Sequence, residues 1–224
     1  MRLDTKNGFL VKGRCFEGYQ KRGTVEAFLE VLNQTSPKEI ILLGIIESLF
    51  GTNGTLGLVP TVVSKLNWPL CVGGGIRTND DVDFAFRSGA DRILVNSTLF
   101  DDQSVVKYAL GKYGTQAVVA HIQISKQSDK FLLARWAGKK IEVATLDHHL
   151  SVIGDLGISE VHISSVLDDG CGKGWNCLPI LRKVKQFGFE ATISGGLRSY
   201  DWVDQDICPD GIALASALYP SVEK

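Results

Sequence analysis

Two glycine-rich segments of this chain carry nearly the same sequence, and both could bind phosphate. Residues 72–82 read VGGGIRTNDDV, and residues 193–203, 121 positions later, read ISGGLRSYDWV. Glycine lets a backbone approach an anion closely, and the N–H groups between a strand end and the next helix attract negative charge. A tight turn that needs a positive φ angle would use the same glycines, so the motif alone leaves both interpretations open.

A second feature in each half favours the phosphate interpretation. Further along each half, another apolar strand candidate ends in small or polar residues. Phosphate sites in α/β barrels are often built from consecutive loops of this kind. We therefore predict two phosphate cradles and a ligand with a phosphate at each end. The predicted cradle residues are Gly75, Asn96 and Ser97 in the first half, and Gly195, Gly196, Ala215 and Ser216 in the second.

The elements that must position these loops are strands that alternate with helices. Apolar runs rich in Ile, Leu and Val are separated by amphipathic segments, which indicates βαβ units and a parallel sheet. Eight strands predict a (β/α)₈ TIM barrel, and we expect residues 1–224 to form one domain. Strands are expected at 1–4, 39–45, 69–73, 91–96, 117–123, 160–165, 190–194 and 210–215, and helices at 24–34, 79–89, 102–113 and 178–188.

The repeat extends beyond the glycine motifs and divides the chain into two similar half-barrels, approximately residues 1–115 and 116–224. Asp91 matches Asp210 at an offset of 119 positions, and Glu39 matches Glu160 at an offset of 121. Strands one to four are therefore expected to repeat as strands five to eight. Few residues follow the last strand candidate, so we expect a shortened last helix.

Composition excludes several classes of function. The 224 residues carry a net charge of −1, which offers no basic surface for a nucleic acid. No apolar run approaches the roughly 18 residues of a membrane span, and no signal peptide is visible, so we expect a cytoplasmic protein. The five cysteines form no C-x-x-C pair, which favours free thiols. The four histidines lack ligand spacing, so we expect neither a metal nor a cofactor.

These motifs together resemble the histidine-biosynthesis barrels, and most closely the cyclase subunit of imidazole glycerol phosphate synthase. The resemblance rests on LDTKNGFLVKGRCFEGYQKRG (3–23), VGGGIRTNDDV, GADRILVNSTLF (89–100), ISGGLRSYD and DGIALAS. The VKG and FEG segments of the first loop favour the cyclase over its sister isomerase, which shares the glycine motifs.

The resemblance implies a reaction and a partner. The family substrate is a bisphosphorylated aminoimidazole carboxamide ribonucleotide, which fits the two cradles. Ammonia from a glutaminase subunit at the N-terminal barrel face passes through the barrel, and cyclisation with cleavage yields imidazole glycerol phosphate. By the same resemblance, Asp4 is a catalytic carboxylate and Lys12 lies on the mobile first loop. The residues matching the ammonia entrance are Glu39, Arg92 and Glu160.

The sequence departs from this family at a catalytic position. The family has a second carboxylate on strand five, where this chain has Gln123. An amide cannot exchange a proton near neutral pH, and general acid–base catalysis contributes typically ~10²–10⁴ in rate. Asp169 is expected near the barrel mouth and could assist Asp4, although a solvated loop carboxylate is equally ordinary.

Two histidines are expected inside the barrel. Alternation places His121 on the inward face with Gln123, and His162 inward on the neighbouring strand. They form either a satisfied buried polar pair or a modified channel or proton relay.

The sequence leaves several functions open. The first is the cyclase. The alternatives are a diverged paralogue in another amidotransfer pathway, such as surface-sugar amidation, a non-catalytic protein that binds a phosphorylated ligand, and the sister isomerase.

Overall fold

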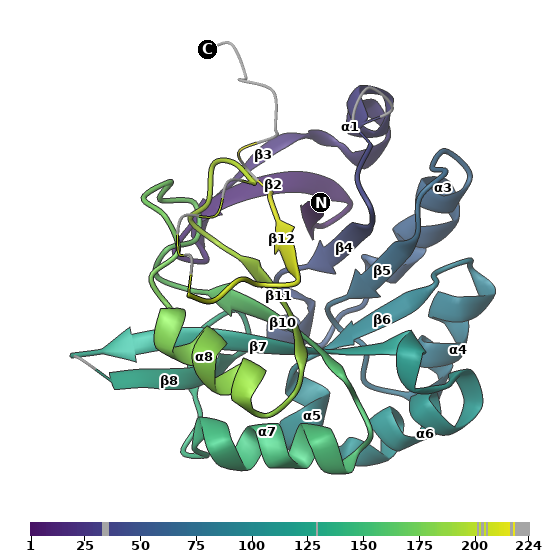
Figure 1. The fold of residues 1–224 in the computed structure, drawn as a ribbon. Helices are drawn as coiled ribbons and strands as arrows, with labels where there is room; N and C mark the ends of the chain where they lie inside the picture. Colours follow the sequence, from purple (N-terminus) through teal and green to yellow (C-terminus); the bar gives the residue numbers. More distant parts are fainter. Residues whose placement is uncertain are drawn as a thin grey trace.

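Eight parallel strands form a closed barrel in the computed structural model, which describes residues 1–32, 36–128, 130–200, 202, 204, 206–215 and 217 (Figure 1). Backbone hydrogen bonds connect the strands in chain order. The Arg2 N–H donates to the Leu214 carbonyl at 2.8 Å, which joins the last strand to the first. The strands are β1 (Arg2–Lys6), β4 (Ile40–Gly44), β5 (Leu70–Gly73), β6 (Arg92–Val95), β7 (Val118–Gln127), β10 (Glu160–Ser165), β11 (Glu190–Ser194) and β12 (Gly211–Ala213).

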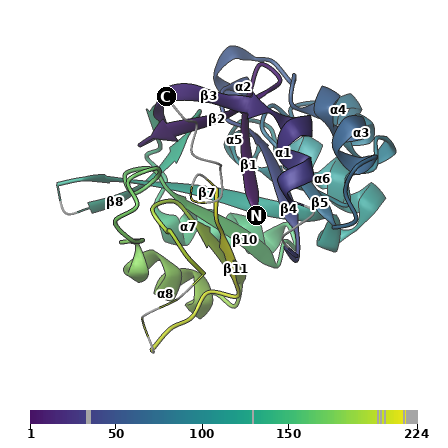
Figure 2. The same ribbon diagram turned by 90° about the horizontal axis from the view of Figure 1, so that it is seen from above.

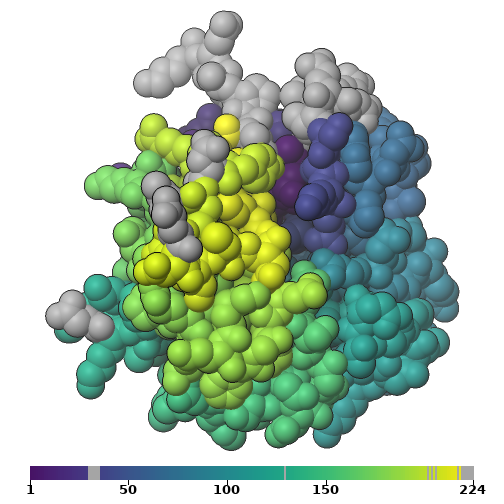
Figure 3. All heavy atoms as spheres, viewed as in Figure 1, coloured from purple at the N-terminus to yellow at the C-terminus, as the bar shows by residue number. Residues whose placement is uncertain are grey.

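The ring closure is visible at the surface. In Figure 3 the yellow C-terminal segment that contains β12 lies against the purple and dark blue N-terminal segment. All eight predicted strands are present, so the predicted (β/α)₈ barrel is confirmed.

Two antiparallel hairpins extend the barrel sheet, and the sequence interpretation did not include either of them. The first hairpin, β2 (Phe9–Arg14) and β3 (Glu17–Thr24), follows β1. The second consists of the end of β7 with β8 (Lys130–Arg135), and β9 (Lys140–Ile141) pairs with β8. Figures 1 and 2 show β2 and β3 arching over one end of the barrel, while β7 and β8 project as an arm. Both hairpins follow the carboxyl ends of their barrel strands.

Helices cover the outside of the barrel (Figure 1). The Thr78 hydroxyl accepts a hydrogen bond from the Asp81 N–H, and the Asp81 carboxylate accepts one from the Thr78 N–H, so a capping box starts α4. Any helix after β12 lies outside the described residues. The helices are α1 (Val25–Leu32), α2 (Glu47–Phe50), η1 (Leu56–Leu58), α3 (Val59–Val63), α4 (Asn79–Arg87), α5 (Ser97–Asp101), α6 (Gln103–Tyr113), η2 (Thr115–Ala117), α7 (Leu146–Asp155) and α8 (Leu178–Gln186). None of these helices combines the length and the apolar character that crossing a membrane requires.

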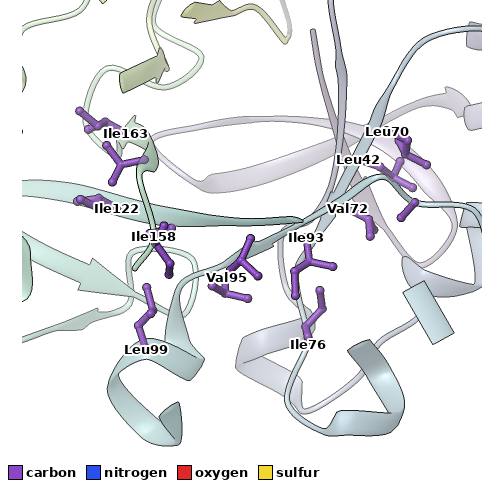
Figure 4. Packing of buried hydrophobic residues seen from close by; sticks show 14 of the residues in the cluster. Leu42, Leu70, Val72, Ile76, Ile93, Val95, Leu99, Ile122, Ile158 and Ile163 are labelled. Atoms are coloured by element: carbon purple, nitrogen blue, oxygen red, sulfur yellow. The ribbon is translucent and has the colours of Figure 1, made fainter. Parts of the chain in front are cut away.

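The main hydrophobic core lies between the strands and the helices. Alternate strand residues such as Leu42, Val72, Ile93 and Ile163 point outward and are fully buried (Figure 4). Burying a side chain of this size contributes roughly 1.5–3 kcal/mol. The intervening residues of the same strands point into the barrel, which is why the interior can carry other chemistry.

One side of the barrel interior is apolar and the other is polar. The apolar side is a cluster of buried residues made of Ile41, Leu43, Cys71, Leu94, Val119 and Ala213. Charged and polar side chains from β1, β7, β10 and β11 occupy the other side.

The two halves repeat one specific pair of hydrogen bonds. In the first half the Asp91 carboxylate accepts from the Leu70 N–H at 2.8 Å, and the Asp91 N–H donates to the Leu70 carbonyl at 2.9 Å. In the second half Asp210 makes the same two bonds with Ala191, at 2.7 and 2.9 Å. Asp91 and Asp210, which match in sequence, therefore make equivalent hydrogen bonds in the two halves.

Candidate functional site

The carboxyl ends of the barrel strands surround a small cavity of about 40 Å³, which we call the mouth. Catalytic residues of (β/α)₈ barrels lie at this end because the βα loops converge there. The mouth brings together six of the predicted site residues, which come from β1, β7 and three βα loops. They are Asp4, Gly75, Asn96, Ser97, Gln123 and Asp169.

Arg2 forms the centre of an ion-pair cluster in the wall of the mouth. Arg2 Nε lies 2.8 Å from Asp4 Oδ1, and Arg2 Nη2 donates a hydrogen bond to Asp4 Oδ2 at 2.9 Å. The same Nη2 donates to Asp169 Oδ1 at 2.8 Å. The side chain of Arg2 is only 2% exposed, and those of Asp4 and Asp169 are 12% and 10% exposed. One guanidinium therefore holds two carboxylates next to each other.

Two serines and two histidines continue this cluster across the barrel. Arg2 Nη1 donates to Ser194 Oγ at 2.7 Å, and Ser194 Oγ lies 2.9 Å from Ser164 Oγ. His121 Nε2 lies 2.8 Å from Ser164 Oγ, and His162 Nε2 lies 2.8 Å from Ser194 Oγ. The imidazole centroids are 5.3 Å apart, edge to face. The two histidines thus meet inside the barrel, as their alternation predicted.

Burial and charge set the protonation of this cluster. Burial opposes the charged form of Arg2, but the carboxylates of Asp4 and Asp169 outweigh it, so the net effect raises the pKa of Arg2. Burial, followed by the Arg2 charge, lowers the pKa of His121 to about 3. Burial, then His121 and Arg2, lowers the pKa of His162 well below its usual value. Both imidazoles are therefore neutral at pH 7, and Arg2 is cationic.

Asp169 titrates differently from an ordinary carboxyl group. Burial raises the pKa of Asp169, Asp4 adds to this, and Arg2 and Lys12 oppose it without cancelling it. Lys12 lies on β2, half-buried, where its charge acts on Asp169. A carboxyl group with a raised pKa beside a second carboxylate is an arrangement that can divide acid and base roles.

Gln123 holds a loop in place at the mouth. Its Oε1 accepts a hydrogen bond from the Gly138 N–H at 3.0 Å. Gly138 belongs to the turn between β8 and β9, in which Trp136, Ala137 and Gly138 all have positive φ angles. Ala137 from this turn lines the mouth. The residue at the position of the missing carboxylate therefore fixes the wall of the cavity.

The first hairpin supplies another part of the wall. Phe16 and Tyr19 line the mouth, and Phe16 packs on Ala134 and Val166 in a small apolar cluster. The two hairpins therefore meet above the barrel and narrow its opening.

The first predicted cradle is closely packed. A Cβ on Gly74 would lie 2.1 Å from the Gly44 carbonyl oxygen, and one on Gly75 would lie 2.3 Å from the Thr52 oxygen. Asn96 Nδ2 donates to the His121 carbonyl at 2.8 Å, while its Oδ1 is buried without a hydrogen-bond partner. Neither glycine therefore leaves space for a side chain, as a tight turn at this strand end requires.

The second cradle repeats this packing. A Cβ on Gly195 would lie 2.8 Å from the Ser165 oxygen, and one on Gly196 would lie 2.3 Å from the Gly174 oxygen. In both halves the first of the two glycines packs against the end of the preceding barrel strand, and the second packs against a carbonyl group of a loop. Ala215 is half-buried after β12, and Ser216 lies outside the described residues.

The three predicted entrance residues meet at the opposite end of the barrel. Arg92 lies between the two glutamates. Its Nη2 lies 2.8 Å from Glu39 Oε1 and donates a hydrogen bond to Glu160 Oε1 at 3.1 Å. Their side chains are about a quarter exposed, so they form a charged ring at the amino ends of β4, β6 and β10.

Sequence reasoning missed Arg2. The alternation that places Asp4 inside the barrel also places Arg2 there, so the signal was present. It also missed Glu47, a buried carboxylate that fills the space beside Gly44 and accepts a hydrogen bond from Thr55 Oγ1. Among the described residues, no group of three or more metal-ligating side chains is assembled.

Comparisons with known proteins show which sequences this chain is similar to. The family model described as "Histidine biosynthesis protein" matches residues 2–222. The chain is 31% identical over 182 residues to the imidazole glycerol phosphate synthase subunit HisF of Saccharolobus solfataricus, covering 81% of this chain and 72% of that protein. It is 30% identical over 221 residues to the HisF subunit of Chlorobium phaeobacteroides, covering 97% and 87%. The HisF subunit of Sulfurisphaera tokodaii is 28% identical over 218 residues.

Proposed function

Because the chain belongs to the histidine biosynthesis protein family, we propose that it is a cyclase-type barrel that uses ammonia on a bisphosphorylated aminoimidazole carboxamide ribonucleotide to form imidazole glycerol phosphate. The observation that carries this proposal is the pair of carboxylates, Asp4 and Asp169, held by one guanidinium in the wall of the mouth. The relatives that match the chain are named as subunits of this synthase.

In this proposal Asp169 takes the role of the family's second carboxylate, whose position is occupied here by Gln123. Burial raises the pKa of Asp169, which suits its carboxyl group to the acid role, and Asp4 accepts a proton as the substrate cyclises. Arg2 keeps both groups in place, since it contacts both through the same Nη2. The neutral imidazoles of His121 and His162 do not compete with Arg2 for the carboxylates.

The two cradles hold the two ends of the substrate. Gly75, Asn96 and Ser97, which all line the mouth, bind one phosphate. Gly195, Gly196, Ala215 and Ser216 bind the other. Lys12, on β2, adds positive charge beside Asp169 for the anionic substrate.

The charged ring Glu39, Arg92 and Glu160 is the ammonia entrance in this proposal, and a glutaminase subunit docks on that face. HisF proteins are named as subunits of a synthase, which supports a partner for this chain.

A second candidate function is favoured by the buried Arg2. Its guanidinium and its partners Ser164 and Ser194 occupy the polar side of the interior between the entrance ring and the mouth. A chain with this filled interior fits a diverged paralogue, which acts in another amidotransfer pathway such as surface-sugar amidation or binds a phosphorylated ligand without turnover.

Steady-state turnover of the bisphosphate substrate with excess ammonium salt separates the two candidates. Added ammonium removes the need for a partner and for transport through the barrel. Turnover that depends on both Asp4 and Asp169 supports the cyclase. Binding without turnover supports the paralogue.

A further inference from the structure

Two cysteines that are 156 positions apart in sequence meet at the rim of the mouth. Cys15 Sγ lies 3.7 Å from Cys171 Sγ, and both thiols point to the Leu167 carbonyl, at 3.2 and 3.4 Å. Both residues are half-buried, so small reagents can reach them. No local motif predicts this pair, because neither cysteine belongs to a C-x-x-C motif.

The backbone around each thiol is already fixed in this position. Cys15 and Phe16 form the turn between β2 and β3 with φ angles of 52° and 57°, a conformation that residues with a Cβ rarely adopt. The Cys15 N–H donates to the Asp169 carbonyl at 2.8 Å. A Cβ on Gly170 would lie 2.2 Å from the Gly13 oxygen, so the two loops touch through their backbones.

We propose that Cys15 and Cys171 form a reversible disulfide that locks the β2–β3 turn to the β10–α8 loop and so fixes the rim of the mouth. The bond requires the two sulfurs to approach by about 1.7 Å, from 3.7 Å to the S–S distance of about 2.05 Å. Phe16 and Asp169, the neighbours of the two cysteines, both line the mouth, so the bond acts on the cavity itself.

The oxidant that we propose is a small-molecule disulfide such as oxidised glutathione. The Cys171 thiolate attacks one sulfur of this disulfide, whose S–S bond breaks, and the first glutathione leaves with the electron pair and takes up the proton from Cys171. The Cys15 thiolate then attacks Cys171 Sγ, and the second glutathione leaves in the same way. Two protein thiols are oxidised, and one disulfide is reduced to two thiols.

The environment of the pair supports this order of attack. Burial raises the pKa of the Cys15 thiol, so Cys15 is the weaker first nucleophile. The exposed Arg14 guanidinium contacts the Cys171 thiol and offers a cation to the carboxylates of an incoming glutathione.

Equilibration in glutathione buffers of increasing oxidation tests the proposal without any substrate. After an acid quench and alkylation of the unfolded protein, Cys15 and Cys171 should be lost together from the alkylatable thiols, and peptide mapping should join Cys15 to Cys171. The Cys15→Ser variant should instead carry a glutathione on Cys171. The Cys208→Ser variant is the matched control, because Cys208 is an exposed thiol away from the mouth, and it should still form the internal bond.

Hydrogen exchange then tests the lock. Amides of residues 13–17 and 166–172 should exchange more slowly in the oxidised protein, and reduction with dithiothreitol should restore the original rates. The proposal is wrong if Cys15 and Cys171 stay alkylatable in a buffer that glutathionylates Cys208, or if the bond forms and exchange in both loops is unchanged.

Discussion

Arg2 and Asp4 lie two residues apart on β1 and form an ion pair inside the barrel, with Arg2 Nη2 and Asp4 Oδ2 2.9 Å apart. Both side chains point inward because side chains alternate along a strand. Asp169 reaches the same guanidinium from the loop after β10. Arg2 therefore supplies the positive charge that balances Asp4 and Asp169 at the mouth.

Replacing this cation should destabilise the protein strongly. Arg2→Met leaves Asp4 and Asp169 without their shared partner, and breaking a buried pair costs about 3–5 kcal/mol of unfolding free energy. Urea denaturation at pH 7 measures the change. The control is Arg182→Met, because Arg182 pairs with Asp206 at 3.8 Å with both side chains largely exposed, and such pairs contribute about 1 kcal/mol or less. Equal small effects of the two substitutions would contradict the cluster.

Acid should destabilise the protein through His121. Burial in the folded state lowers the pKa of His121 from its ordinary value of 6.5 to about 3, so below pH 6.5 the unfolded chain takes up a proton that the folded protein does not bind. The contribution of neutral His121 to the free energy of unfolding is constant above pH 6.5 and is lost as the pH falls from there toward 3. Between pH 7 and 5 this loss amounts to about 2 kcal/mol.

Denaturation of His121→Gln at both pH values checks this prediction, since the variant should lose about 2 kcal/mol less than the native protein over the same interval. His148→Gln, at an exposed position on α7, should keep the native pH dependence. The same loss in His121→Gln as in the native protein would mean that His121 is not buried in its neutral form.

A negative charge in the first cradle should block phosphate. Ser97→Glu places a carboxylate at the start of α5 beside the mouth, and like-charge repulsion should weaken binding of the bisphosphate substrate by at least about tenfold. Ser104→Glu makes the same change at the exposed start of α6 and should leave affinity unchanged. Titration calorimetry compares them, and an unaltered dissociation constant in Ser97→Glu would remove this cradle from the proposal.

Asp169 should be required for turnover. Asp169→Asn removes the second carboxyl group and should lower kcat with ammonium by about 10²–10⁴, the usual contribution of general acid–base catalysis. Asp155→Asn, at an exposed position on α7, should keep native turnover. Gln123→Glu adds a carboxylate and still offers an acceptor to the Gly138 N–H. If the double variant Asp169→Asn/Gln123→Glu regains the kcat that Asp169→Asn loses, a carboxyl group at either position can fill this role.

Local sequence patterns were sufficient to predict the barrel. Runs such as EIILLGI are apolar on both faces, which is typical of strands buried in a parallel sheet, and all eight were located. The inward position of His121 and His162 followed from alternation alone. The matched pair Asp91 and Asp210 also makes equivalent hydrogen bonds in the two halves, as the repeat indicated.

The contacts at the mouth could not be predicted in the same way. The β2–β3 turn has Cys15 and Phe16 at positive φ, where a sequence would ordinarily show glycine or asparagine. The bond from Gly138 to Gln123 depends on where the β8–β9 turn folds back, which no local pattern records. Arg2 was overlooked because an arginine is expected at a surface, and only its two carboxylate partners explain its burial.

The most direct test of the account is the turnover of the bisphosphate substrate by the purified protein in excess ammonium salt, measured for the native chain and for Asp4→Asn. We expect the native protein to form imidazole glycerol phosphate. We expect Asp4→Asn to keep its affinity for the substrate while kcat falls by about 10²–10⁴. Equal turnover by both proteins, or binding without turnover by the native chain, would contradict the account.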